Sequence, residues 1–188
     1  MKKTLALTLA ILMAFAMLLS FAACGGTDDA EETTAPAKTE LVTASVYGLS
    51  FKVPADFTEF TEKQPGAKSA NKGAGASIAV TDIIDASELP FDSWTEENYI
   101  SDTLAGTTDA KILEFSKDKK VSGYDALYVH YTTKSQSGTE LEGYNYVIYY
   151  PLQDGGTGYQ SITFAMVKSV ESSLTANITE VLESLSAE

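Results

Sequence analysis

The chain of 188 residues has no arginine, one histidine and one cysteine, and each scarcity removes a class of function. Without arginine the chain cannot form the bidentate hydrogen bonds by which a guanidinium group binds phosphate. A formal net charge of −13 also repels nucleic acid. The single histidine, His130, cannot build a histidine-rich metal site, and the spacing shows no Ser-His-Asp set. No cysteine follows Cys24, which excludes a disulfide and thiol catalysis in the rest of the chain. We expect no nucleic-acid partner, no cofactor and no enzyme activity.

The first 24 residues carry a targeting pattern. Lys2 and Lys3 precede an apolar run over 4–23, and small residues then lead directly into Cys24. This pattern resembles a bacterial lipoprotein signal peptide, which is removed before a cysteine that carries a lipid. It predicts a signal peptide over 1–23, lipidation of Cys24, and anchoring to the cell membrane on its extracytoplasmic face. The apolar run is also long enough to span a bilayer, so an uncleaved signal anchor remains an alternative.

Residues 25–40 contain no large apolar side chain, so they cannot bury enough surface to offset the entropy lost on ordering. We therefore expect a disordered acidic tether over 24–40. The remaining stretch, 41–188, is long enough for one domain with its own core. This domain organisation would place a single folded domain at the end of a lipid-anchored spacer.

Within that domain the hydrophobic spacing predicts an α+β fold. Alternation in Leu49, Phe51 and Val53 indicates a strand, 61–76 is polar and glycine-containing and is expected to be a loop, and 77–84 is expected to be a strand. Ser93 and Glu96 have capping-box spacing, which predicts a helix running to about residue 104. Four further strands and a terminal helix are expected over 110–117, 123–134, 143–151, 158–167 and 170–185. Turn-forming residues between the last three strands make them antiparallel neighbours, giving an antiparallel sheet flanked by helices.

A family resemblance rests on the segment 47–57, which reads Tyr-Gly-Leu-Ser-Phe-Lys-Val-Pro-Ala-Asp-Phe. It resembles the opening hairpin of PsbP-like domains, which tends to read Tyr-Gly-aromatic-Ser-Phe-x-x-Pro-x-x-Trp; Phe57 stands in place of the tryptophan. The resemblance implies an α-β-α sandwich around an antiparallel sheet, in a family with many secreted lipoproteins of unknown role. It carries over no catalytic residue, and the metal-cluster role of photosynthetic members is not transferred.

Tyrosine is the residue used most unusually. Eight of the ten tyrosines lie between Tyr124 and Tyr159, and strand propensity with cross-strand packing is the ordinary explanation of this enrichment. An exposed row of tyrosines could also bind sugars or a peptide. We expect a ligand-binding surface at Tyr128, His130 and Tyr146 that points away from the terminal helix, with both tyrosines exposed. In the expected strand over 123–134, the side chains that alternate with Tyr128 and His130 are expected to face the core: Leu127, Val129 and Tyr131.

One set of acids has spacing that suggests metal ligation. Asp82, Asp85 and Glu88 are three residues apart, as calcium ligands could be. Calcium loops carry denser acid and a glycine at the sharp turn, and neither is found here. We interpret these side chains as solvated acids and predict no metal site.

These observations favour a non-enzymatic binding or accessory module of the cell envelope with a glycan, peptide or protein ligand. Two alternatives remain open. One is a hydrolase that acts on envelope polymers through surface carboxylates, although 26 acids make some plausible pair inevitable. The other is a structural partner of a membrane complex.

The anchoring hypothesis gives a direct test. Replacing the lipid-bearing side chain, Cys24→Ala, should release the domain into the medium or leave an unprocessed precursor, because the lipid is lost or processing is blocked. Fractionation of cells followed by intact mass analysis measures both outcomes. A variant that is correctly cleaved and still membrane-bound would contradict the lipid anchor.

Overall fold

The computed structural model describes residues 39–72 and 75–187. The expected signal peptide, Cys24 and nearly all of the expected tether lie outside the described residues. Within the described part of the chain, no helix is long and apolar enough to cross a membrane.

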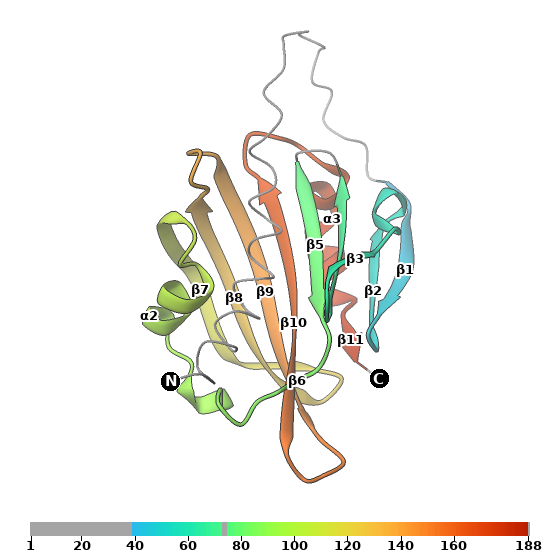
Figure 1. Ribbon diagram of the computed structural model, residues 1–188. Helices are drawn as coiled ribbons and strands as arrows, with labels where there is room; N and C mark the ends of the chain where they lie inside the picture. The colour runs from blue at the N-terminus through green and yellow to red at the C-terminus, as the bar shows by residue number, and fades with distance from the viewer. Residues whose placement is uncertain (1–38, 73–74, 188) are drawn as a thin grey trace, which may run out of the picture.

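The centre of the fold is an eight-stranded antiparallel sheet (Figure 1). Its strand order is β3-β4-β5-β10-β9-β8-β7, and β6 pairs with β10 beyond the end of β5. The strands are β3 (Thr61–Gln64), β4 (Ala67–Lys72), β5 (Ala76–Thr81), β6 (Ile84–Asp85), β7 (Thr108–Val121), β8 (Tyr124–Lys134), β9 (Glu140–Pro151) and β10 (Thr157–Val167). The expected antiparallel pairing of β8 with β9 and of β9 with β10 is confirmed.

A second layer covers one side of this sheet. It consists of the hairpin β1 (Leu41–Val46) and β2 (Leu49–Pro54), the terminal helix α3 (Ser173–Glu183), and the short strand β11 (Ser186–Ala187), which pairs with β2. Tyr47 and Gly48 join the hairpin strands with φ values of 51° and 80°. A two-residue hairpin turn of this kind needs left-handed backbone at both positions. The Tyr-Gly motif therefore forms the tight turn of the opening hairpin.

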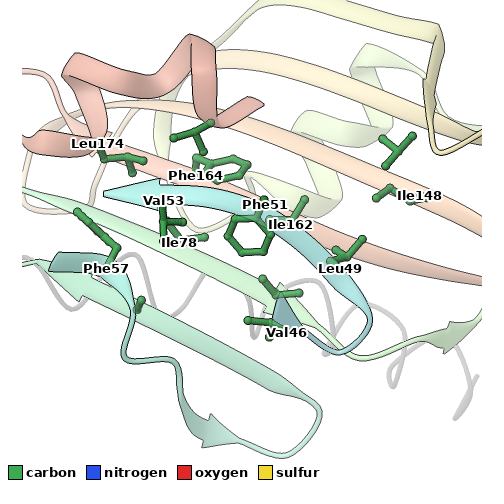
Figure 2. Close-up of a cluster of buried hydrophobic side chains, with 14 of the residues drawn as sticks. Val46, Leu49, Phe51, Val53, Phe57, Ile78, Ile148, Ile162, Phe164 and Leu174 are labelled. Atoms are coloured by element: carbon green, nitrogen blue, oxygen red, sulfur yellow. The ribbon is translucent and has the colours of Figure 1, made fainter. Parts of the chain in front are cut away.

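Strand β2 packs on the main sheet beside α3 and β11. Leu49, Phe51 and Val53 are buried, as their alternation predicts, and they point toward the main sheet in Figure 2. The ring of Phe51 meets that of Phe164 edge to face, with 6.2 Å between centroids. Leu174 of α3 is fully buried in the same cluster. Burial of such apolar side chains, at about 1.5–3 kcal/mol each, holds the second layer on the sheet.

The other side of the sheet is covered by the segment 82–107. This segment contains two turns of 3-10 or π helix and one short α-helix: η3 (Phe91–Ser93), α2 (Glu96–Asn98) and the π-helical η4 (Tyr99–Thr103). Trp94, Tyr99 and Leu104 pack against the odd-numbered side chains of β8. The expectation of a helix-flanked sheet is thus confirmed only in part, because α2 and η4 are short and irregular.

The mid-chain helix also begins later than its spacing predicts. Its N-cap is Thr95, whose side chain accepts a hydrogen bond from the Asn98 amide, while the Asn98 side chain accepts one from the Thr95 amide. Ser93 instead donates its hydroxyl to the Pro90 carbonyl in the preceding turn. The prediction that Ser93 begins the capping box was wrong. Two overlapping cap patterns occur in this segment, and it is the Thr95–Asn98 pair that forms the reciprocal hydrogen bonds.

The expected loop over 61–76 is wrong in its larger part. Strands β3 and β4 form a hairpin there, with Gly66 at a φ of 75° between them. The buried side chains of β4 are small, including Ala67, Ser69 and Ala70. Small and hydroxyl-bearing residues can be buried without giving a hydrophobic alternation, so the pattern resembled a loop.

A close cross-strand contact provides a test of this packing. Gly143 lies opposite Tyr131 in the β8–β9 ladder, and a Cβ atom at position 143 would overlap the buried Tyr131 ring. We expect Gly143→Ala to lower the free energy of unfolding by about 2 kcal/mol, through overpacking. Urea denaturation measures the loss. Gly156→Ala, in the exposed β9–β10 turn, serves as the control and should change stability little; equal effects would contradict the packing argument.

Candidate functional site

Four ring side chains from β8 and β9 form the candidate site. Tyr128 lies directly opposite Tyr146, and His130 lies directly opposite Tyr144. The Tyr128 and Tyr146 rings are tilted at 47° with centroids 4.9 Å apart, and the His130 and Tyr144 rings are stacked at 10° and 4.2 Å. We call these four residues the aromatic face. They lie toward the β7 edge of the sheet, whereas α3 and the β1–β2 hairpin lie toward β5 (Figure 1).

The structure corrects two expectations about these tyrosines. Tyr128 is only 7% exposed and Tyr146 is half-buried, although both were expected to be exposed. They also lie on the same side of the sheet as α3, because Ile148 and Tyr150, which share the parity of Tyr146, belong to the core cluster of Leu174. The expectation failed because both sides of the sheet are covered, so burial of one parity does not imply exposure of the other.

His130 is tied to a neighbouring carboxylate. Its Nε2 atom lies 2.7 Å from Oε1 of Glu142, which also accepts a hydrogen bond from the Tyr144 hydroxyl at 3.0 Å. Burial, and then the bond to Glu142, raises the pKa of Tyr144. Glu142 therefore orients both rings of the stacked pair by accepting from the Tyr144 hydroxyl and bonding His130 Nε2.

Strand β7 adds a second carboxylate and a cation. The Lys119 ammonium lies 3.5 Å from Oε1 of Glu114 and 5.3 Å from the centroid of the Tyr128 ring. Burial, and then the charges of Glu114 and the nearby Tyr146, raises the pKa of Tyr128 to about 12. The aromatic face is thus bordered by Glu142 on β9 and by Glu114 and Lys119 on β7.

Sequence reasoning missed these three charged residues, for different reasons. Glu142 shares the parity of Tyr144 and Tyr146 and could have been found by extending the expected strand 143–151 by one residue. Glu114 and Lys119 could not, because register shifts interrupt β7 between Ile112 and Glu114 and between Ser116 and Lys119. Each such irregularity changes which side of the sheet the following residues face.

The groups that a ligand could contact are those of the aromatic face that have no partner within the described part of the chain. His130 and Tyr144 each cover one ring face of the other, and Lys119 lies over the Tyr128 ring. In contrast, the hydroxyls of Tyr128 and Tyr146 have no hydrogen-bond partner among the described residues. The site thus offers hydroxyls, ring edges and carboxylates more than open ring faces.

The acids singled out in the sequence lie elsewhere and serve local turns. Asp82 accepts a hydrogen bond from the Ile83 amide, and Asp85 accepts one from Ser87. These bonds to Ser87 lower the pKa of Asp85. Among residues 39–72 and 75–187, no group of three histidine, cysteine or acidic side chains could hold a metal ion.

A cavity of about 660 Å³ lies at one end of the sheet, between the β9–β10 turn and the segment 86–91. Two of its polar side chains, those of Tyr149 and Asp125, already have partners. The Tyr149 hydroxyl accepts from the Trp94 indole and donates to the Leu89 carbonyl, and Asp125 forms an ion pair with Lys120. The aromatic face, with its unpaired hydroxyls, is therefore the better candidate.

The raised tyrosine pKa values predict an alkaline loss of stability. Burial raises the pKa of Tyr128, Tyr149 and Tyr159 to about 12, whereas an unfolded tyrosine titrates near 10. From about pH 10 to 12 the unfolded chain therefore binds fewer protons than the folded protein does. The free energy of unfolding should consequently fall as the pH rises. Denaturant titrations at stepped pH values measure the fall.

Tyr159→Phe is the matched variant. Its buried hydroxyl has no hydrogen-bond partner among the described residues, so its removal should cost no stability at neutral pH. The alkaline decline should become shallower in this variant. A stability that stays level through pH 11 in the unmodified chain would contradict the argument.

Comparison with known proteins gives distant likenesses among solved structures. No family model matches the chain, and no curated protein matches it. Among solved structures, the Ran-binding protein Mog1p of Saccharomyces cerevisiae is similar at 13% identity and a TM-score of 0.47, over 79% of this chain and 96% of Mog1p. LpqN of Mycobacterium tuberculosis, described as involved in cell envelope biogenesis, is similar at 9% identity and a TM-score of 0.41, over 73% of this chain and 82% of LpqN. Likenesses this distant transfer no function.

Proposed function

We propose that this chain is a lipoprotein held at the extracytoplasmic face of the membrane by Cys24, and that its domain binds a peptide or protein segment without catalysis. The single observation that carries the binding role is the aromatic face with its two bordering carboxylates. The anchoring rests on the targeting pattern of the first 24 residues. The domain would then present the aromatic face to partners in the cell envelope.

Binding is favoured over catalysis by how the reactive groups are used. Nucleophilic catalysis needs a hydroxyl or thiol activated by a neighbouring base. The one histidine directs Nε2 to Glu142, and its ring is stacked on Tyr144. No serine, threonine or cysteine is bonded to His130 among the described residues. This arrangement supports a fixed recognition surface.

A peptide or protein is favoured over a glycan by the ring geometry. A sugar that stacks on an aromatic side chain needs an open ring face. On the aromatic face, His130 and Tyr144 each cover one ring face of the other, and Tyr128 is only 7% exposed. Unpaired hydroxyls and carboxylates match the amides and charged side chains of a polypeptide, to which tyrosine also offers contact area at low entropic cost.

Selection of peptides from a random library displayed on phage tests this proposal on the full chain. Selected peptides should lose at least about tenfold in affinity for Tyr146→Ala, the loss typical of a well-placed aromatic contact. Phe91→Ala is the control, because Phe91 is a half-buried aromatic that packs against Tyr149 on the other side of the sheet. Circular dichroism establishes that both variants are folded.

Two results would overturn the proposal. Equal losses for Tyr146→Ala and Phe91→Ala would place binding outside the aromatic face. Release of soluble products from peptidoglycan by the unmodified chain would favour the hydrolase alternative.

A further inference from the structure

We infer that the aromatic face contains an ammonium subsite, that its ligand is a lysine-bearing segment of a partner protein, and that Lys119 occupies this subsite in the free protein. The inference rests on the proposed function and specifies its ligand. The subsite is formed by the Glu114 carboxylate and by the Tyr128 ring, which packs against the Tyr146 ring.

The geometry around Lys119 is that of ammonium recognition. Its Nζ atom lies 3.5 Å from a Glu114 oxygen and 5.3 Å from the centroid of the Tyr128 ring. A carboxylate together with an aromatic ring within about 6 Å is the usual surrounding of a bound ammonium group. The chain's own lysine therefore marks where a ligand amine would sit.

Lys119 is held weakly enough to be replaced. The side chains of Lys119 and Glu114 are 45% and 49% exposed, and ion pairs this exposed contribute little. A ligand lysine could form the same two contacts and also hydrogen-bond, through its backbone, to the unpaired hydroxyls of Tyr128 and Tyr146. Lys119 would then act as an internal competitor that leaves when the ligand binds.

The charge around the subsite favours a cation over an anion. Glu114 and Glu142 border the aromatic face, and Glu142 is already shared between His130 and Tyr144. Lys119 is a cation placed over the Tyr128 ring. The formal net charge of −13 for the whole chain adds a long-range attraction for basic partners.

Lysine is attracted to any acidic protein, so binding at a subsite must be distinguished from this general attraction. Matched pairs of variants make the distinction. Lys68 lies 4.6 Å from the Tyr47 ring centroid, so Lys68→Met removes one charge and one cation–ring contact, as Lys119→Met does. Glu97 of α2 is exposed and belongs to the segment covering the opposite side of the sheet. Glu97→Gln therefore matches the charge change of Glu114→Gln.

The experiment is calorimetric titration of the full chain in detergent with acetylated hexalysine amide. We expect Lys119→Met to tighten binding by about threefold or more beyond Lys68→Met, since the competitor is removed. Glu114→Gln should weaken binding by about threefold or more beyond Glu97→Gln. Tyr146→Ala should weaken it as well.

Equal effects within each matched pair would overturn the ammonium subsite, because only net charge would then matter. The proposed function has a separate outcome. If phage-selected peptides without lysine still depend on Tyr146, binding at the aromatic face stands and the ammonium subsite fails. If neither selected peptides nor hexalysine responds to Tyr146→Ala, both fail.

Discussion

Both sides of the central strands β8 and β9 are covered by other parts of the chain, and this constraint determines where their side chains can act. On the α2 side the covering segment is fixed by a buried amide. Asn145 of β9 is 2% exposed and donates to the Ile162 carbonyl and the Thr163 hydroxyl, while its oxygen accepts from the Tyr99 hydroxyl. Because a buried amide without partners is costly, this network fixes both β10 and η4 relative to β9. With the α2 side closed in this way, the proposed binding role is confined to the border of the layer on the α3 side.

On the α3 side the covering layer is centred on β5 and β10 and leaves the aromatic face at its border. The Gln160 amide, which donates to the carbonyls of Tyr47 and Thr81 and accepts from the Tyr150 hydroxyl, ties the hairpin turn to the sheet. Tyr150 is therefore a structural residue, although it shares its parity with Tyr146. The aromatic face begins four residues away along β9, beyond the Ile148–Ala126 pair, where Tyr146 and Tyr128 meet without such a bond. The distinction between core and site along β9 thus follows from the extent of the second layer.

Sequence reasoning was most reliable where one physical signal acted alone. The strands β8, β9 and β10 and their antiparallel pairing follow from long apolar runs separated by turn residues, and β2 follows from its alternation. The hairpin β3–β4 was missed because its buried residues are small. The tyrosines were assigned to a surface, but their exposure depends on the placement of a hairpin and a helix that are distant in sequence. No local pattern contains that information.

The charged border of the aromatic face was harder to predict than the rings themselves, and the reason lies in β7. This edge strand is 14 residues long, and three register irregularities interrupt its pairing with β8. Irregular edges protect a sheet against pairing with other chains, and they also turn side chains away from strict alternation. Glu114 and Lys119 lie next to two of these irregularities. The irregularities that make the edge less suited to strand addition therefore also bring a carboxylate and an ammonium group to the Tyr128 ring of β8.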